Sequence, residues 1–234
     1  MRTHEPIVTV ITPTTGKNSL FNLIDSIKAQ GVPVCHIILW DEIRQDNFLR
    51  GKDINSIAQE GDWEKRNYLL NNIEIKSKTV SGIAPGSALR AIGLMAAQTD
   101  LVTFADDDII WEEDHLISLI EAINEKQWAF TKRKIWSKIS KDEFEYLGVD
   151  EFESVGEDAK TDYKMVDNNC MMFNRRFGTS AACLYRETKN YNDDRLMYAF
   201  LKKHAGIAGK TNKATINQVC PKRLYQFFKQ NCTL

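Results

Sequence analysis

Apolar and polar residues alternate in blocks through the first half of the chain, as they do where strands are separated by helices. The β-branched run at residues 7–11 and the apolar runs at 34–40 and 101–105 each predict a buried strand. Apolar side chains recur at helical spacing in residues 18–27 and 87–97, which predicts a helix before the second and the third of these strands. Strands linked by helices favour a mainly parallel sheet with right-handed crossovers.

Weaker signals continue this pattern along the chain. Residues 42–61 are polar and irregular and predict a loop, whereas residues 138–165 are charged and predict a mobile connection. Helices are expected at 63–70 and at 193–204, the second ending before Gly206. Further short strands are expected at 73–80, 128–130, 135–136 and 181–185.

The composition is that of an ordinary globular protein. The 234 residues, 43% hydrophobic and 27% charged, are enough for one large α/β domain, with or without a short appendage. The formal net charge of -1 gives no case for nucleic-acid binding. No apolar stretch approaches the ~20 residues of a membrane-spanning helix. The first residues lead directly into a strand pattern, and five scattered cysteines without a CxxC pair fit reduced thiols, so we expect no signal peptide and a cytoplasmic protein.

Three consecutive carboxylates, Asp106, Asp107 and Asp108, follow the strand predicted at 101–105. In an extended chain the first and third would project to one side, where two like charges call for a cation between them. Oxygen-only ligands favour Mg²⁺ or Mn²⁺ over zinc. The alternative is a charged turn that caps a helix starting at Trp111, because Asp is favoured at helix N-termini.

A further acidic residue, Asp41, ends the strand predicted at 34–40. Ligands of parallel α/β sheets bind beyond the carboxyl ends of the strands. Asp41 and the Asp triplet are therefore expected at the same edge of the sheet, which favours a binding site there.

In this order the motifs resemble the family 2 glycosyltransferases of the GT-A fold, over about residues 6–206. The motifs that carry the resemblance are Thr12-Pro13-Thr14 after the first strand, Asp41, the helix start at 86–94, the Asp triplet, and Asp193-Asp194 before a late helix. The resemblance implies a single GT-A domain with a mainly parallel, mixed central sheet flanked by helices. Its nucleotide-binding half would cover about residues 1–110 and its acceptor half about 111–206, followed by a C-terminal extension at 207–234.

The resemblance also implies an activity and a role for each motif. The activity is inverting, hexosyltransferase-type transfer of a sugar from a nucleotide-sugar, with UDP the commonest nucleotide, to a hydroxyl of a glycan or lipid-linked glycan, in surface polysaccharide biosynthesis. Asp108 and Asp106 would bind Mn²⁺ or Mg²⁺, and Asp193, or Asp194 if the register shifts by one, would deprotonate the acceptor. The residues expected to contact the donor nucleotide are Thr12, Pro13, Thr14, Asp41, Arg90, Asp106 and Asp107.

The sequence departs from the family pattern at two informative places. Thr15-Gly16 replaces the usual Tyr-Asn after the first turn, and Asn192 replaces the acid before the expected base. Two other function classes therefore stay open: a sugar-phosphate nucleotidyltransferase, and a binding protein that keeps the fold without catalysis. The first would need a Gly-rich basic loop, of which residues 12–17 are a poor version.

Several residues have a structural interpretation beside the functional one. Asp193 would also fit the role of a helix cap. Arg90 would also fit an exposed arginine on a helix, without contact to a ligand. Arg175-Arg176 would meet a diphosphate or remain solvated, and Trp111 and Trp136 would stack on a sugar or pack in the core. Residues 221–229 mix basic and aromatic side chains. They would lie on an anionic membrane at the inner face, or pack against the domain or a second subunit.

Overall fold

The structure is a computed structural model that describes residues 5–41, 68–75, 86–150, 165–186 and 193–233. Within these residues, nine strands form one mixed sheet in the order β3-β2-β1-β4-β8-β6-β9-β5, with β7 paired to β6. The strands are β1 (Val8–Thr14), β2 (Val34–Asp41), β3 (Tyr68–Ile75), β4 (Leu101–Phe104), β5 (Ile109–Trp111), β6 (Trp128–Lys138), β7 (Phe144–Asp150), β8 (Met171–Asn174) and β9 (Gly209–Cys220). The α-helices are α1 (Ser19–Lys28), α3 (Ser87–Ala96), α4 (His115–Ile123), α5 (Gly178–Arg186), α6 (Asp193–His204) and α7 (Tyr225–Asn231).

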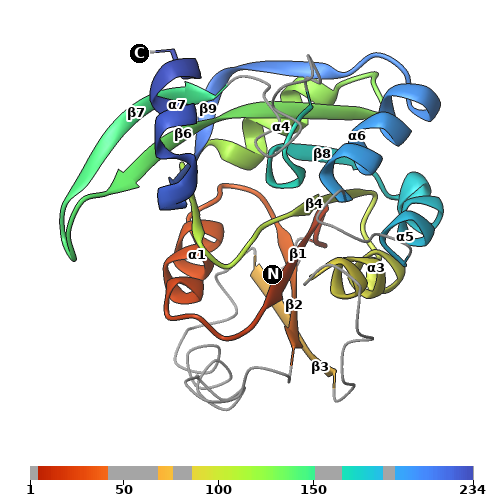
Figure 1. The fold of residues 1–234 in the computed structure, drawn as a ribbon. Helices are drawn as coiled ribbons and strands as arrows, with labels where there is room; N and C mark the ends of the chain where they lie inside the picture. Colours follow the sequence, from red (N-terminus) through yellow and green to blue (C-terminus); the bar gives the residue numbers. More distant parts are fainter. Residues whose placement is uncertain (1–4, 42–67, 76–85, 151–164, 187–192, 234) are drawn as a thin grey trace.

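The first half of the sheet, β3-β2-β1-β4, is parallel throughout. All seven residues of β1 are buried, as expected of a strand with helices on both sides. Figure 1 shows α1 on one face of this half and α3, backed by α5, on the other. The carboxyl ends of β1, β2 and β4 therefore lie together, and the mixed α/β fold predicted from the sequence is confirmed.

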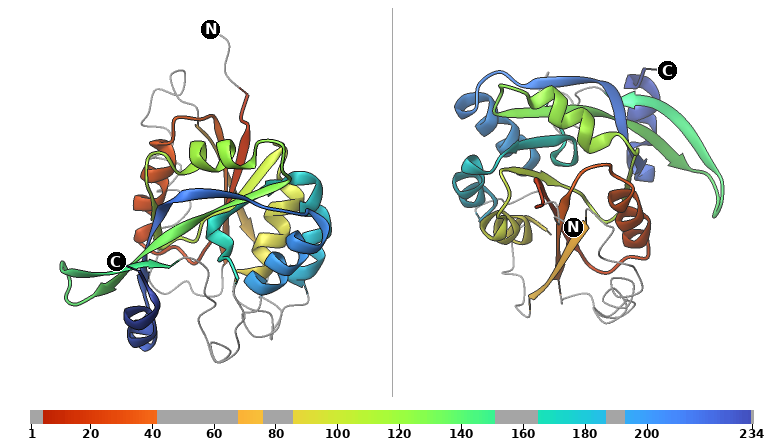
Figure 2. Two further views of the ribbon diagram at one scale, coloured as in Figure 1. Left: turned by 90° about the horizontal axis from the view of Figure 1, so that it is seen from above. Right: turned by 180° about the vertical axis from the view of Figure 1, so that it is seen from behind.

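The second half of the sheet mixes directions. β8 runs antiparallel to both β4 and β6, while β9 runs parallel to β6 and antiparallel to β5. Figures 1 and 2 show α4 and α7 on opposite faces of the β6–β9 layer, and the β6–β7 hairpin extending away from the body. β5, which follows the Asp triplet directly, is joined to the sheet through β9.

Some predicted elements are wrong in type. Residues 181–185, expected as a strand, lie inside helix α5, and residues 68–70, expected as a helix, belong to strand β3. Short apolar runs fit a buried helix and a buried strand equally well, because periodicity needs length to show. The helix expected from Trp111 begins only at His115, since residues 109–111 form β5.

Other elements differ in extent. The strand pieces at 128–130 and 135–136 are parts of one strand, β6, whose register shifts at Phe130/Lys132, Lys132/Arg133 and Ile135/Trp136. Such irregularities interrupt the alternation that a sequence pattern relies on. The mobile connection expected at 138–165 contains strand β7, while residues 151–164 lie outside the described part of the chain.

The last segment of the chain packs on the domain. Part of the stretch expected to form an extension is β9, which lies inside the sheet between β6 and β5. Phe228 of α7 is buried in a small core with Ile135, Leu147 and Cys220. No helix in the described residues is long and apolar enough to cross a membrane.

Candidate functional site

A cavity of about 190 Å³ opens at the carboxyl ends of β1 and β4. Three segments far apart in the sequence form its walls: the turn after β1, the start of α3, and the turn between β4 and β5. The lining residues are Pro13, Thr14, Thr15, Lys17, Gly86, Leu89, Arg90, Asp106, Asp107 and Asp108. This is the edge at which the sequence predicts a binding site.

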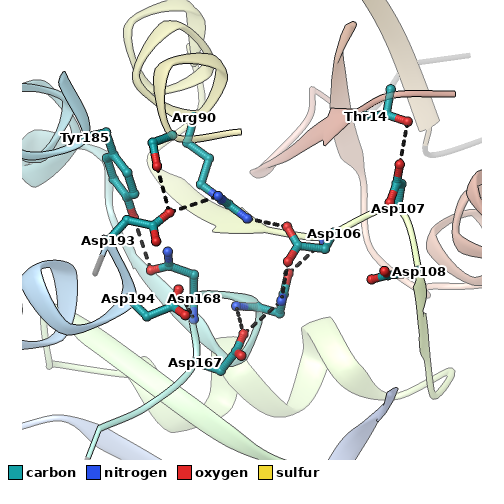
Figure 3. A network of polar contacts seen from close by, with 12 residues as sticks. Thr14, Arg90, Asp106, Asp107, Asp108, Asp167, Asn168, Tyr185, Asp193 and Asp194 are labelled. Carbon is teal, nitrogen blue, oxygen red and sulfur yellow. Dashed lines mark hydrogen bonds and ion pairs between the residues drawn. The ribbon is translucent and has the colours of Figure 1, made fainter. Parts of the chain in front are cut away.

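The Asp triplet lies in a turn, because strand β4 already ends at Phe104. The alternation of an extended chain therefore does not set its side chains: Asp107 and Asp108 share the ammonium of Lys17, whereas Asp106 faces Arg90. Figure 3 shows Asp106 directed toward Arg90 and Asp107 toward Thr14. The helix-cap alternative is wrong, because the triplet is followed by strand β5.

Arg90 is buried between two carboxylates. Its Nη2 donates to Asp106 and its Nη1 donates to Asp193 Oδ2 over 3.0 Å. Burial opposes its charge, but Asp106 and Asp193 outweigh burial and raise the pKa of Arg90. Its Nε has no partner in the described structure. The exposed helical arginine considered from the sequence is therefore wrong, and Arg90 links the triplet to the start of α6.

The helix that carries Arg90 begins at a glycine for a local reason. Gly86, at the N-cap of α3, has a left-handed backbone with φ +85°. A Cβ built there would meet Arg90 Nη1 at 3.2 Å and Pro13 at 3.5 Å. A side chain at this position would crowd both walls of the cavity, so glycine keeps the arginine in place.

The opposite side of Asp106 is held by residues that the sequence analysis missed. Asn169, almost fully buried, accepts from the Asp106 backbone N–H (2.7 Å) and donates from Nδ2 to Asp106 Oδ2 (3.0 Å). Asn169 also donates to Asp167, whose other oxygen accepts from the buried Arg133. Arg90 and Asn169 hold the pKa of Asp106 below its usual value, although burial alone would raise it.

The two aspartates at the start of α6 differ in their surroundings. Asp193 is buried, and its Oδ2 accepts from Arg90 and from Ser87 Oγ (3.1 Å). Asp194 is half-buried beside Asn168, whose backbone N–H lies 3.4 Å from its Oδ1. Burial, with Asp167 and Asp193 nearby, raises the pKa of Asp194 well above its usual value. Figure 3 shows both carboxylates in one network with Asp106 and Asp167.

The turn after β1 brings Lys17 to the triplet. Thr14 Oγ1 accepts from the Gly16 N–H (2.8 Å) and donates to Asp107 Oδ2 (2.7 Å), so one hydroxyl ties the turn to the triplet. Gly16 has φ +85°, a left-handed conformation that glycine adopts readily. Burial opposes protonation of Lys17, but Asp107 and Asp108 outweigh it and raise the pKa of Lys17.

Most of the predicted site residues meet at this cavity: Pro13, Thr14, Arg90, Asp106, Asp107 and Asp108 line it. Asp193 reaches it through Arg90. Thr12 does not line it, because its buried hydroxyl lies 2.8 Å from His36 Nε2, within the sheet. Asp41 ends β2 at the same edge, but its side chain is outside the described part of the structure.

The two tryptophans weighed as sugar-stacking residues take different places. Trp111 is buried and stacks on His115 with ring centroids 4.2 Å apart, which is core packing. Trp136 is half-buried on β6, where it contacts Tyr146 and donates to Asn217 Oδ1. Neither lines the cavity.

The donor set around the cavity limits what cation it would hold. Among the described residues, no group of three or more His, Cys, Asp or Glu side chains is arranged to hold a metal ion. Asp106 and Asp107 are already bound by neighbours, and Asp108, 52% exposed, contacts Lys17. Such a set fits a hard cation that takes its remaining oxygens from substrate phosphate and water, as Mg²⁺ commonly does.

This arrangement, a curled mixed sheet flanked by helices with a cavity at the carboxyl ends of its parallel strands, is a GT-A-like α/β fold. Solved structures with a similar fold include those of Staphylococcus aureus TarS, a glycosyltransferase. The TarS fragment 1–349 superposes with a TM-score of 0.59 at 16% identity over 94% of this chain. The chain spans 62% of that fragment and 38% of a longer TarS chain.

Two further TarS structures hold ligands. The complex of TarS 1–349 with UDP has a TM-score of 0.60 and 16% identity, and the complex with UDP-GlcNAc has 0.57 and 14%. This chain spans 62% and 59% of those two chains. At this identity the likeness establishes the fold. No protein-family model and no curated protein sequence matches the chain.

Proposed function

We propose that this chain is a glycosyltransferase that takes a sugar from a nucleotide-sugar donor, with UDP as the nucleotide. The observation that carries the proposal is the cavity in which the turn after β1, Arg90 and the Asp triplet meet, at the ligand-binding edge of a GT-A-like sheet. TarS, solved with UDP and with UDP-GlcNAc, has a similar fold and supports this choice of donor.

Different lining residues would bind different parts of the donor. Pro13, Thr14 and Asp41 would hold the nucleoside from the ends of β1 and β2. Arg90 lines the cavity, and a guanidinium suits phosphate. Asp107 would act mainly through Thr14, from whose hydroxyl it accepts a hydrogen bond. That bond would keep the turn after β1 in place beside the triplet.

The metal part of the proposal is Mn²⁺ or Mg²⁺ held by Asp108 with Asp106. Bound there, the cation would stabilise the negative charge that grows on the departing diphosphate. Arg90 and Asn169 fix the Asp106 carboxylate from two sides, so little of its orientation has to be set when a ligand arrives.

Asp193 is the proposed general base, with Asp194 as the alternative. A base must be ionised and close to the attacking hydroxyl, and the ion pair with Arg90, which lines the cavity, fixes the Asp193 carboxylate behind that residue. Direct displacement by that hydroxyl would invert the anomeric configuration. If Asp194 is the base instead, its raised pKa predicts that activity falls as pH drops through that pKa, because a protonated carboxyl accepts no proton.

The acceptor in this proposal is a hydroxyl of a glycan or lipid-linked glycan of a surface polysaccharide. The exposed Lys222 and Arg223, before α7, would meet an anionic membrane that presents such an acceptor. Removing residues 221–234 would also remove the buried Phe228, so the better test is Lys222→Glu with Arg223→Glu. Binding to anionic vesicles should fall, and unchanged binding would argue against membrane contact.

The test of the donor site is thermal stability against UDP, GDP, dTDP, CDP and their sugar conjugates, each with and without Mn²⁺. A ligand that binds only the folded state raises the melting temperature by mass action. We expect a shift with UDP that depends on Mn²⁺ and is lost in Asp108→Ala. Asp108→Asn is the matched control, because it keeps the shape and removes the charge.

Catalysis needs a second readout, since a binding protein would pass the first. Asp193→Asn, which keeps an oxygen acceptor for Arg90 Nη1, should keep the nucleotide-induced shift and lose sugar transfer and donor hydrolysis. No shift with any nucleotide would contradict the proposal, and pyrophosphate release from a nucleoside triphosphate with a sugar phosphate would indicate a nucleotidyltransferase.

A further inference from the structure

Lys17 is the cation of the cavity that the sequence reading left without a role. Its Nζ lies 2.9 Å from Asp107 Oδ1 and 2.8 Å from Asp108 Oδ2. The turn that delivers it is built for this contact, because Thr14 binds both the Gly16 N–H and Asp107. Lys17 is therefore placed by local structure and is not a stray surface lysine.

The two cations that line the cavity differ in freedom. Arg90 is 9% exposed in its side chain, and its two Nη groups pair with Asp106 and Asp193. Lys17 is 47% exposed, and its ammonium ends a flexible four-carbon stem with three donors that rotate together. Of the pair, Lys17 is the cation whose ammonium is half-exposed, and its contact with the exposed Asp108 is the one that it is able to exchange most readily.

The charge balance requires such a change when an anion enters. Among the described lining residues, three carboxylates face two cations, so these residues by themselves do not make the cavity electropositive. A diphosphate needs the carboxylates neutralised and a positive group turned toward its oxygens. A divalent cation on Asp108 would supply the first and would compete with Lys17 for the same carboxylate oxygens.

We infer that Lys17 is an exchangeable counter-ion: it neutralises Asp107 and Asp108 in the free protein and turns to the donor diphosphate when a divalent cation takes its place. The inference rests on the proposed function for the identity of the diphosphate. It makes Lys17 a donor-binding residue and, at the same time, a competitor of the metal.

Opposite effects of one substitution test this inference. Lys17→Met keeps an unbranched side chain only one atom shorter and removes the charge. In the absence of nucleotide, Mn²⁺ affinity, followed by the electron paramagnetic resonance signal of free Mn²⁺, should increase. At saturating Mn²⁺, UDP affinity measured by calorimetry should fall about tenfold, because one hydrogen bond from a charged donor to phosphate is lost.

Two control variants isolate the cause. Lys17→Arg keeps the charge and should leave Mn²⁺ affinity near that of the wild type. Lys213→Met removes an exposed lysine of a pair with Asp114, outside the cavity lining, and should change neither affinity.

The results separate this inference from the function on which it rests. Mn²⁺ affinity that is unchanged or weaker in Lys17→Met overturns the counter-ion role, and UDP affinity that is unchanged overturns the donor-binding role. If the wild type binds no nucleotide while Lys17→Met still binds Mn²⁺ more tightly, the proposed function fails and the counter-ion role is supported.

Discussion

Two buried arginines of the described residues resemble each other closely: Arg90 on α3, beside the parallel half of the sheet, and Arg133 on β6, in the other half. Arg90 lies between Asp106 and Asp193 with its guanidinium 5.9 Å from the Phe104 ring centroid. Arg133 contacts Asp150 and Asp167 and lies 5.7 Å from the Phe228 ring centroid. By burial, by paired carboxylates and by aromatic contact, the two arginines are alike.

Their surroundings differ in one respect that bears on the proposed function. Arg133 also donates to Gln218 and does not line the cavity. Arg90 lines the cavity and holds Asp106, which is about one-third exposed. A buried arginine between carboxylates is thus a structural device in itself, and Arg90 becomes the candidate for ligand contact because of its place at the cavity.

The largest effect is expected from Arg133→Met. The substitution leaves two buried carboxylates without their partner, so the free energy of unfolding should fall by about 3–5 kcal/mol. Urea denaturation would measure it. Arg133→Lys should recover part of the loss, because an ammonium still supplies the charge but not the three-way contact. A loss below about 1 kcal/mol would show that the Asp pair is solvated after all.

Arg90→Met should cost less stability and more function. Water in the cavity reaches Asp106, so the expected loss is about 1.5–3 kcal/mol, the range for hydrogen bonds to charged groups. Binding of UDP should weaken at least tenfold, measured by calorimetry on protein shown to be folded. If Arg90→Met and Arg133→Met impaired UDP binding equally, the distinction between the two arginines would be lost.

Asn169 connects the two arginines through Asp106 and Asp167, and Asn169→Asp would break that link. The new carboxylate would face two others, which should cost about 2 kcal/mol at neutral pH. Crowding would raise the pKa of the new carboxyl in the folded state. The cost should therefore be small below about pH 4, where the group is protonated in the folded and the unfolded chain, and grow as pH rises toward neutrality. Denaturation of the variant and the wild type at pH 4 and pH 8 would check this.

The smallest effect concerns one buried histidine in each half, His36 on β2 and His115 on α4. Burial lowers the pKa of both to about 3, below the ordinary 6.5. The unfolded chain therefore binds protons that the folded chain does not, and stability falls as pH drops below 6.5. Each histidine should contribute about 1 kcal/mol of this loss between pH 6 and pH 5.

Matched substitutions would show how much of that loss of stability each histidine causes. His36→Gln places an amide near the Nε2 that meets Thr12, and His115→Asn places one near the Nδ1 that meets Thr215. Each should remove its share of the pH dependence in urea denaturation. A slope unchanged in both variants would mean that other groups govern the acid response.

The parallel half of the fold could be predicted from the sequence for a physical reason. Strands β1, β2 and β4 are buried on both faces, and helices α1 and α3 are amphipathic, so long runs carry a clear period. The cavity lining followed from the same logic, because carboxyl ends of parallel strands share an edge. The rest was harder: β5 has three residues, β6 shifts register, and the apolar run at 181–185 of α5 is short enough to fit a strand equally well.

The missed site residues act through contacts that no motif records. Asn169 hydrogen-bonds both the backbone N–H and the carboxylate of Asp106, which lies 63 positions away in the sequence. Lys17 depends on the left-handed Gly16 and on Thr14 to turn back toward the triplet. Gly16 was visible as a departure from the family pattern, and it was the one sequence signal that could have led to Lys17.

The position of β9 sets the order in which the site is able to form during synthesis. The turn with the Asp triplet is fixed at one end by β4 and at the other by β5, and β5 joins the sheet through β9. Chains emerge from the ribosome N-terminus first. Every lining residue is therefore made long before residues 209–220 appear, and β5 gains its strand partner only after β9 is released. A nascent chain that stopped short of β9 would carry the complete set of site residues but lack the strand that joins β5 to the sheet.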